Sequence, residues 1–253
     1  MKYKIFDYSI QRNIAKLEGA SVLGSFEVQP DEPITPAELL DRKFDVIEID
    51  GEQYQEFTEF IPVVDWKTNT IASADCLIFK NNTYLPFNLL AETIVRILKK
   101  NVGLVNSQRP VIVIGNNYFI FSVVTELALS GFVDIIVSPI QSDKKETENL
   151  EKRIKKLFFN LNMKIVEIGD ITSAEQNAFL MISNFPREVN KFAYELLIYF
   201  NYLSEGAVFI DCNSINDSSL VEDARKAEIF VIDEVEVLEN KYDYLTELLK
   251  ISP

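Results

Sequence analysis

The sequence contains no histidine among its 253 residues, so it lacks the side chain that most often serves as a general base or a metal ligand. Mechanisms built on a Ser–His or Cys–His pair are therefore excluded. Cysteine is also scarce. Cys76 and Cys212 lie far apart and neither belongs to a C-x-x-C motif, which excludes a zinc ribbon and thioredoxin-like chemistry. We expect two free thiols in a reducing compartment.

Long apolar segments are absent as well. No run of about 18 apolar residues is present, so we expect no transmembrane helix. The first residues, MKYKIFDYSIQRN, are broken by Asp7 and Gln11 and do not resemble a signal peptide. We therefore expect a cytoplasmic protein.

Basic residues are outnumbered, with 25 Lys and Arg against 39 Asp and Glu, which gives a net charge of −14. Such a surface repels phosphate backbones and anionic lipids. The charge therefore argues against nucleic acid and membranes as partners.

A βαβ unit is the clearest feature that the sequence does contain. Residues 111–115 (VIVIG) predict a buried strand, residues 119–130 predict a helix that ends at Gly131, and residues 133–138 predict a second buried strand. Strands joined by a helix in this way are parallel, with a right-handed crossover.

Strands and helices alternate along most of the chain. Before the βαβ unit, residues 44–49 predict a strand and residues 88–100 a helix. After it we expect strands at 164–168, 178–183, 207–211 and 229–232, and helices at 143–159, 189–203, 218–227 and over the last 20 residues, the last folding back on the N-terminal region. Strands without polar alternation belong to sheets covered on both faces. The sequence thus predicts an α/β protein with a doubly wound, Rossmann-type parallel sheet.

The turn after the strand 111–115 is where such a domain binds a dinucleotide, through a G-x-G-x-x-G motif. The sequence here reads Gly115-Asn116-Asn117-Tyr118-Phe119-Ile120, and only the first glycine is present. The next strand ends in Ser138-Pro139, without the acidic residue that reads the ribose of NAD. Two interpretations stay open: a domain that binds no dinucleotide, or a site for an unusual nucleotide or another anion at the helix N-terminus.

Four acidic residues lie on and just after the strand 44–49, namely Asp45, Glu48, Asp50 and Glu52. They could form a cation site, but we expect a solvated acidic edge.

The order of elements from residue 44 onward resembles the shikimate dehydrogenase family. The segment 205–233 is similar to the family's strand, T-P-L-L-like helix start and final strand, with Asp211 and Ala224 in matching places. The segment 73–88 resembles the family's G-A-V-N-T, hairpin and N-T-D sequence, and VEVLENKYDYLTELL resembles its M-L-x-x-Q-A helix. The resemblance implies a two-domain fold, with a substrate domain at residues 1–88 plus 234–253 and a Rossmann-like domain at residues 89–233.

The family's functional residues are largely replaced under this resemblance. Its catalytic lysine falls on Tyr54 and the aspartate paired with that lysine falls on Leu90. Its substrate-binding asparagine falls on Cys76 and its glutamine on Lys241, whereas the asparagine of N-T-D is kept as Asn88. The resemblance therefore implies a vestigial cleft lined by Tyr54, Cys76, Asn88, Leu90 and Lys241, and a degenerate cofactor turn at Gly115, Asn116, Asn117 and Ser138.

Three hypotheses follow. The first, which we favour, is a non-catalytic protein with an interaction or regulatory role, no cofactor, no metal and another protein as its partner. The second is a divergent oxidoreductase that uses NADP or NAD and a different acid or base, such as Tyr54 or Lys241. The third is a sensor that closes on a small molecule without chemistry.

Overall fold

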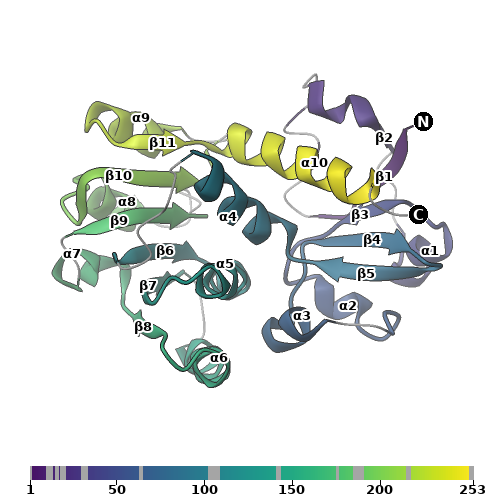
Figure 1. The fold of residues 1–253 in the computed structure, drawn as a ribbon, viewed down its shortest axis with the longest axis horizontal. Helices are drawn as coiled ribbons and strands as arrows, with labels where there is room; N and C mark the ends of the chain where they lie inside the picture. Colours follow the sequence, from purple (N-terminus) through teal and green to yellow (C-terminus); the bar gives the residue numbers. More distant parts are fainter. Residues whose placement is uncertain are drawn as a thin grey trace. The chain divides into compact units, whose positions relative to one another are not determined.

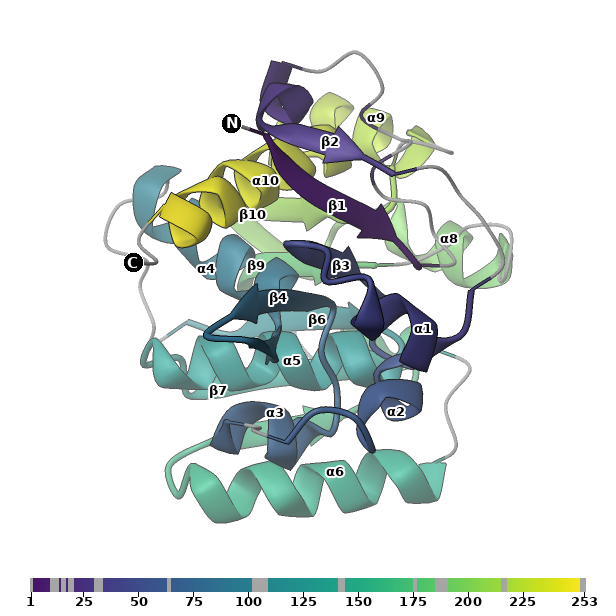
Figure 2. The same ribbon diagram turned by 90° about the vertical axis from the view of Figure 1, so that its right-hand side faces the viewer.

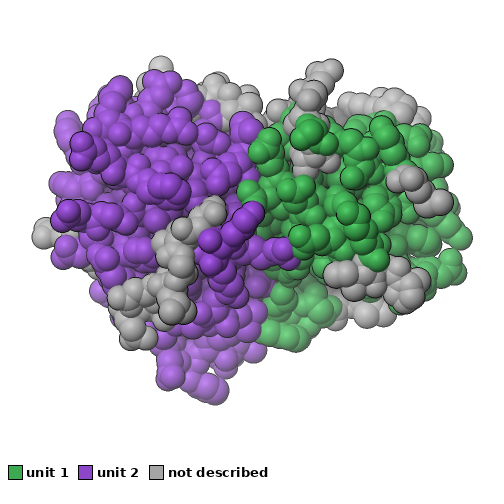
Figure 3. Space-filling model, turned by 45° about the horizontal axis from the view of Figure 1, so that its top comes forward, with its two compact units in different colours: residues 1–93, 238–253 green, residues 94–237 purple. Residues whose placement is uncertain are grey.

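The structure is a computed structural model. It describes residues 2–9, 14, 17, 21–29, 34–62, 65–101, 109–140, 144–174, 177–184, 191–214 and 218–250. The chain divides into two compact units, coloured separately in Figure 3: unit 1 comprises Met1–Thr93 and Leu238–Pro253, and unit 2 comprises Ile94–Val237. The divisions lie inside helices α4 (Leu89–Asn101) and α10 (Glu234–Lys250), whereas the resemblance placed them before each helix.

Unit 1 is built on a five-stranded sheet in the order β2-β1-β3-β4-β5 (Figure 1). Strand β3 is therefore central, and it pairs in parallel with β1 and antiparallel with β4. The bounds of the strands are β1 Tyr3–Asp7, β2 Phe26–Val28, β3 Val46–Glu48, β4 Cys76–Lys80 and β5 Thr83–Phe87.

Local sequence explains several elements of unit 1. Asn81 and Asn82 have φ angles of 50° and 64°, so they make the tight two-residue turn that joins β4 to β5. Helix α1 (Pro36–Asp41) begins with a capping box in which Thr35 and Glu38 bond each other's backbone. The short helices α2 (Tyr54–Phe57) and α3 (Trp66–Ile71) follow β3.

Unit 2 contains a six-stranded sheet in the order β11-β10-β9-β6-β7-β8, and every pairing in it is parallel. This confirms the predicted α/β fold with a Rossmann-type parallel sheet. Its strands are β6 Val111–Gly115, β7 Asp134–Pro139, β8 Asn162–Ile165, β9 Ala178–Ser183, β10 Leu203–Asp211 and β11 Phe230–Ile232.

Helices cover both faces of this sheet. Helices α7 (Ile171–Ala174), α8 (Lys191–Leu197) and α9 (Ser219–Lys226) contribute to one core cluster with Ile112 and Ile114. Strand alternation turns Val111 and Val113 to the other face. Helix α5 (Asn117–Leu129) packs on β6 and β7, beside α6 (Lys144–Leu157), as Figure 2 shows.

The predicted end of one helix is wrong. We expected a helix over residues 189–203, but α8 ends at Leu197 and β10 begins at Leu203. The Leu197 carbonyl accepts the Phe200 N–H at 3.1 Å and the Tyr202 hydroxyl at 3.0 Å, and these two bonds replace the one that a longer helix would have made. Phe200 has a φ of 46°, which ends helical geometry there.

Helix α10 confirms the expected C-terminal helix. Its second half packs on unit 1, where the Tyr242 ring meets Phe26 edge-on with centroids 5.8 Å apart. Within the described residues, no helix is long and apolar enough to cross a membrane.

Candidate functional site

A buried ion pair joins helix α10 to the central strand of unit 1. The Lys241 ammonium lies 2.6 Å from Oε2 of Glu48, and the two side chains are only 2% and 0% exposed. Glu48 faces α10 because it alternates with Ile47, which points into the opposite core. The expectation of a solvated acidic edge is therefore wrong for Glu48, because β3 lies in the middle of the sheet rather than at its edge.

Burial sets the protonation of this pair. It raises the pKa of Glu48 to about 7, although the nearby Lys241 charge acts in the opposite direction. Burial alone would lower the pKa of Lys241, but the Glu48 and Asp75 carboxylates outweigh it and raise that pKa. Lys241 thus stays a cation, whereas Glu48 gains or loses its proton near neutral pH.

Cys76 and Asp75 lie next to the pair. Cys76 is opposite Glu48 in the antiparallel register of β3 and β4, and its thiol is fully buried and free. Burial, followed by the charge of Glu48, raises the pKa of that thiol well above its usual value. A thiol held neutral in this way is a poor nucleophile.

Asp75 has a structural task. Its carboxylate oxygens accept the backbone N–H groups of Leu89 at 2.6 Å and Leu90 at 2.7 Å, which are free donors at the start of α4. Asn88 is buried, and its amide donates to the Ser73 carbonyl at 3.1 Å. Leu90 is half-buried in the first turn of α4.

Two buried polar atoms near the pair have no partner within the described residues. They are Oε1 of Glu48 and the hydroxyl of Tyr242. The Tyr242 pKa is raised well above its usual value by burial and then by the charge of Glu48. Lys241, Glu48, Cys76 and Tyr242 therefore form one polar cluster inside unit 1.

Tyr54 does not join this cluster. Its side chain is 2% exposed and packs with Ile47, Ile49 and Phe57 on the opposite face of the sheet. Burial, and then the charge of Asp65, raises the pKa of its hydroxyl. The structure thus brings Cys76 and Lys241 together with Glu48, which the sequence interpretation did not choose, and leaves Tyr54 apart.

A second ion pair, also missed from the sequence, links three helices of unit 1. The Lys67 ammonium on α3 lies 2.9 Å from Oε1 of Glu92 on α4, and the Tyr244 hydroxyl on α10 donates to Oε2 of Glu92 at 3.0 Å. Both charged side chains are half-buried. These residues are far apart in sequence, so no local pattern could reveal them.

In unit 2, the turn after β6 is filled by the chain's own side chains. The Asn116 side chain is the N-cap of α5 and accepts the Phe119 N–H at 2.9 Å. A Cβ added to Gly115 would lie 2.6 Å from Cδ1 of Phe119, so the Phe119 ring covers the glycine. A backbone donor and the space above the glycine are the two things that a phosphate needs at such a turn.

Asn117 is buried and is bonded to the start of α6. Its amide nitrogen donates to Oε2 of Glu146 at 3.1 Å, and its oxygen accepts the Thr147 hydroxyl at 3.0 Å. The Glu146 carboxylate therefore lies beside the turn, where it would repel a phosphate.

Two hydroxyls near the turn lack partners in the part of the chain that the structure describes. Ser138 and Ser183 are fully buried, and both pair in register with Ile114, on either side of β6. They lie at the carboxyl ends of their strands, which is where open α/β sheets bind ligands.

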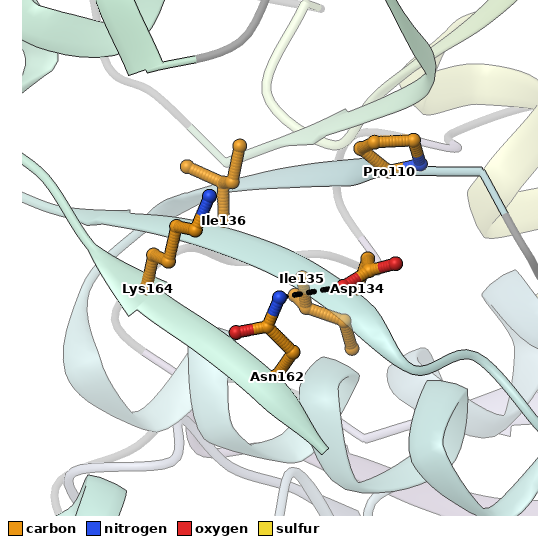
Figure 4. A pocket seen from close by; sticks show the side chains of 6 residues that line it. All are labelled: Pro110, Asp134, Ile135, Ile136, Asn162 and Lys164. Carbon is orange, nitrogen blue, oxygen red and sulfur yellow. Dashed lines mark hydrogen bonds between the residues drawn. The ribbon is translucent and has the colours of Figure 1, made fainter. Parts of the chain in front are cut away.

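A cavity of about 220 Å³ opens at the other end of the same strands (Figure 4). Asp134 and Asn162 begin β7 and β8, and the Asn162 amide donates to Asp134 at 2.7 Å. The cavity is lined by Pro110, Asp134, Ile135, Ile136, Asn162 and Lys164. It is therefore separate from the turn at Gly115. Among the described residues, no group of three Cys, Asp or Glu side chains could hold a metal.

Comparison with solved structures identifies the fold as that of the shikimate dehydrogenases. A shikimate dehydrogenase in complex with NADP+ matches with a TM-score of 0.77 at 13% identity, over 99% of this chain and 90% of that one. A quinate dehydrogenase from Corynebacterium glutamicum in complex with NAD matches with a TM-score of 0.74 at 12% identity, over 97% and 92%. The shikimate 5-dehydrogenase from Listeria monocytogenes, bound to shikimate and NAD, gives 0.72 at 12% identity, over 98% and 95%.

Sequence comparison adds nothing to this likeness, because no family profile and no curated protein sequence matches the chain. The predicted resemblance to the shikimate dehydrogenase fold is confirmed by the solved structures.

Proposed function

We propose that this protein is a non-catalytic protein on a shikimate-dehydrogenase scaffold, and that it acts by binding another protein. The observation that carries the proposal is the buried ion pair between Lys241 and Glu48. The resemblance places a substrate-binding glutamine at Lys241, and here that side chain is 2% exposed and already bonded at 2.6 Å.

A dehydrogenase needs an acid or base that touches the hydroxyl it oxidises. Lys241 and Cys76 are enclosed in unit 1, and Tyr54 is buried in a separate core on the other face of the sheet. Leu90, at the position where the resemblance places the family's aspartate, has no titratable group. These placements support the proposal that none of the three can exchange a proton with a substrate such as shikimate or quinate.

The cofactor turn supports the same proposal independently. The Asn116 cap, the Phe119 ring over Gly115 and the Glu146 carboxylate near Asn117 each oppose a pyrophosphate at α5. Hydride transfer requires a nicotinamide cofactor held against the substrate. We therefore propose that the protein uses neither NADP nor NAD.

The test is a spectrophotometric assay of the full chain with shikimate or quinate and with NADP+ or NAD+. We expect no reduced nicotinamide to form with any of the four combinations. The double variant Tyr54→Lys/Leu90→Asp is the matched control, and we expect it to stay inactive because the turn at Gly115 is unchanged. Turnover by the unmodified protein would refute the proposal.

A divergent NAD(P)-dependent oxidoreductase is the second candidate. It is favoured by the fold, which the NADP- and NAD-bound dehydrogenases share, and by the hydroxyls of Ser138 and Ser183, which have no partner among the described residues. Buried hydroxyls without partners are unusual, and a bound ligand could satisfy them. Under this candidate, a Ser138→Ala/Ser183→Ala variant would lose nucleotide affinity, whereas under the first proposal neither protein binds nucleotide.

A further inference from the structure

The end of helix α6 is a basic surface on an acidic protein. Residues 152–164 contain five basic residues and no acidic residue, although the whole chain has a net charge of −14. Lys152 and Lys156 are exposed, lie one helical turn apart, and have no ion-pair partner in the part of the chain that the structure describes. Their charges are therefore available to another molecule.

Apolar side chains continue this surface beyond the helix. Leu157 is 42% exposed and Phe159 is 92% exposed, the largest value among the exposed large apolar residues of the described chain. Aromatic side chains are enriched in protein interfaces, so the exposed Phe159 marks a candidate contact.

Helix α10 presents the complementary pattern. Glu239 and Asp243 are exposed, again four residues apart, and neither has an ion-pair partner within the described residues. Val235, four residues before Glu239, is 43% exposed. Along the chain, the exposed residues of α10 are therefore one apolar residue followed by two acidic ones. The exposed residues at the end of α6 have the reverse order, with two basic residues followed by an apolar one.

We propose that the exposed end of α6 binds α10 of a second copy of this chain. Four residues of helix rise about 6 Å, so the two basic and the two acidic side chains have the same spacing. An antiparallel approach places Lys156 opposite Glu239 and Lys152 opposite Asp243, and it brings Phe159 toward Val235. The proposal goes beyond the proposed function and holds whether or not the protein turns over a substrate.

This contact joins two different surfaces, so it is a head-to-tail association. Exposed ion pairs contribute only about 0.2–1 kcal/mol each, so the association is weak and depends on protein concentration. It also depends on salt, because the Debye length falls from about 8 Å at physiological ionic strength to about 3 Å at 1 M.

Sedimentation equilibrium of the full chain without nucleotide tests the proposal. We expect the weight-average mass to exceed that of the monomer, to rise with protein concentration and to return to the monomer value at about 1 M salt. A monomer at every concentration in low salt would overturn the proposal. Failure here leaves the dehydrogenase assay unaffected, so the two proposals fail separately.

Charge reversal locates the contact. The variants Lys152→Glu/Lys156→Glu and Glu239→Lys/Asp243→Lys should each be monomeric alone, and an equimolar mixture of the two should associate again. Lys99→Glu/Lys100→Glu, which changes two exposed lysines on α4 by the same charge, should behave as the unmodified protein. Circular dichroism confirms that each variant is folded. Association that survives either reversal, or a mixture that stays monomeric, would contradict the proposed contact.

Discussion

Lys241 and Glu48 form a buried pair in which each side chain depends on the other for charge compensation. Removing two charges from water costs nearly as much free energy as their Coulomb attraction gains, so the pair adds little net stability. Losing one member is different, because the other is then left buried and uncompensated. Single changes at this pair should therefore have larger effects than the double change.

Lys241→Met should lower the free energy of unfolding by about 3–5 kcal/mol at a pH above the Glu48 pKa, since it leaves the carboxylate without a partner. Glu48→Leu/Lys241→Met should be close to the unmodified protein or more stable than it. Urea denaturation monitored by circular dichroism measures both. A double variant as unstable as the single one would argue against mutual compensation.

The pH dependence of stability carries a signature of Glu48. Its folded-state pKa of about 7 lies above the usual value of 4.5, so the folded chain binds this proton more tightly than the unfolded chain. The stability that Glu48 contributes is present below pH 4.5 and is lost as pH rises to about 7, by about 3 kcal/mol in total. Denaturation curves across this range should show the loss in the unmodified protein but not in Glu48→Leu/Lys241→Met. Parallel pH profiles for the two would count against the raised pKa.

At the scale of elements, the turn between β6 and α5 is held by its own side chains. Asn116 caps the helix, and the Phe119 ring lies against Gly115. The Phe119 N–H at the start of α5 is therefore bonded by a side chain of the same turn. In a dinucleotide-binding turn, such N–H groups are free to bind a phosphate.

Asn116→Ala should destabilise the protein by about 1 kcal/mol through the lost cap, which thermal unfolding measures.

Gly115→Ala should also destabilise the protein, because the added Cβ meets Phe119 at 2.6 Å. In the Phe119→Ala background, the Gly115→Ala change should have a much smaller effect, since the obstructing ring is gone. Thermal unfolding of the unmodified protein, Gly115→Ala, Phe119→Ala and the double variant provides this double-mutant cycle. Additive effects of the two changes would contradict the contact.

The sequence predicted elements best where a local pattern decides them. The apolar run 111–115 and the glycine at 131 were enough for β6 and the end of α5. The end of α8 was missed because it lies at Phe200, a non-glycine residue with a positive φ, and at Tyr202, whose side chain bonds back to the helix.

The candidate site was harder to predict. Glu48 looked solvated because its acidic neighbours in sequence suggested an edge, and only the strand order places β3 in the centre. Its partner lies 193 residues away, so no spacing in the sequence could indicate the pair.

At the scale of the whole molecule, the solved structures identify the fold but do not assign an activity. The chain matches shikimate and quinate dehydrogenases over nearly its full length, yet at 12–13% identity. A shared fold does not transfer an activity, which depends on particular side chains. Under the resemblance seen in the sequence, the family's functional positions fall on Leu90 and on Tyr54, Cys76 and Lys241, and the last three side chains are buried. This burial supports the proposal that the chain does not carry out the family's reaction.

The measurement that tests this account most directly is isothermal titration calorimetry of the full chain with NADPH and with NADH, each at millimolar concentration. We predict no heat of binding from either cofactor, because Asn116, Phe119 and Glu146 occupy or oppose the phosphate position. A saturable binding heat from either one would contradict the account and would favour a divergent dehydrogenase that uses Ser138 and Ser183.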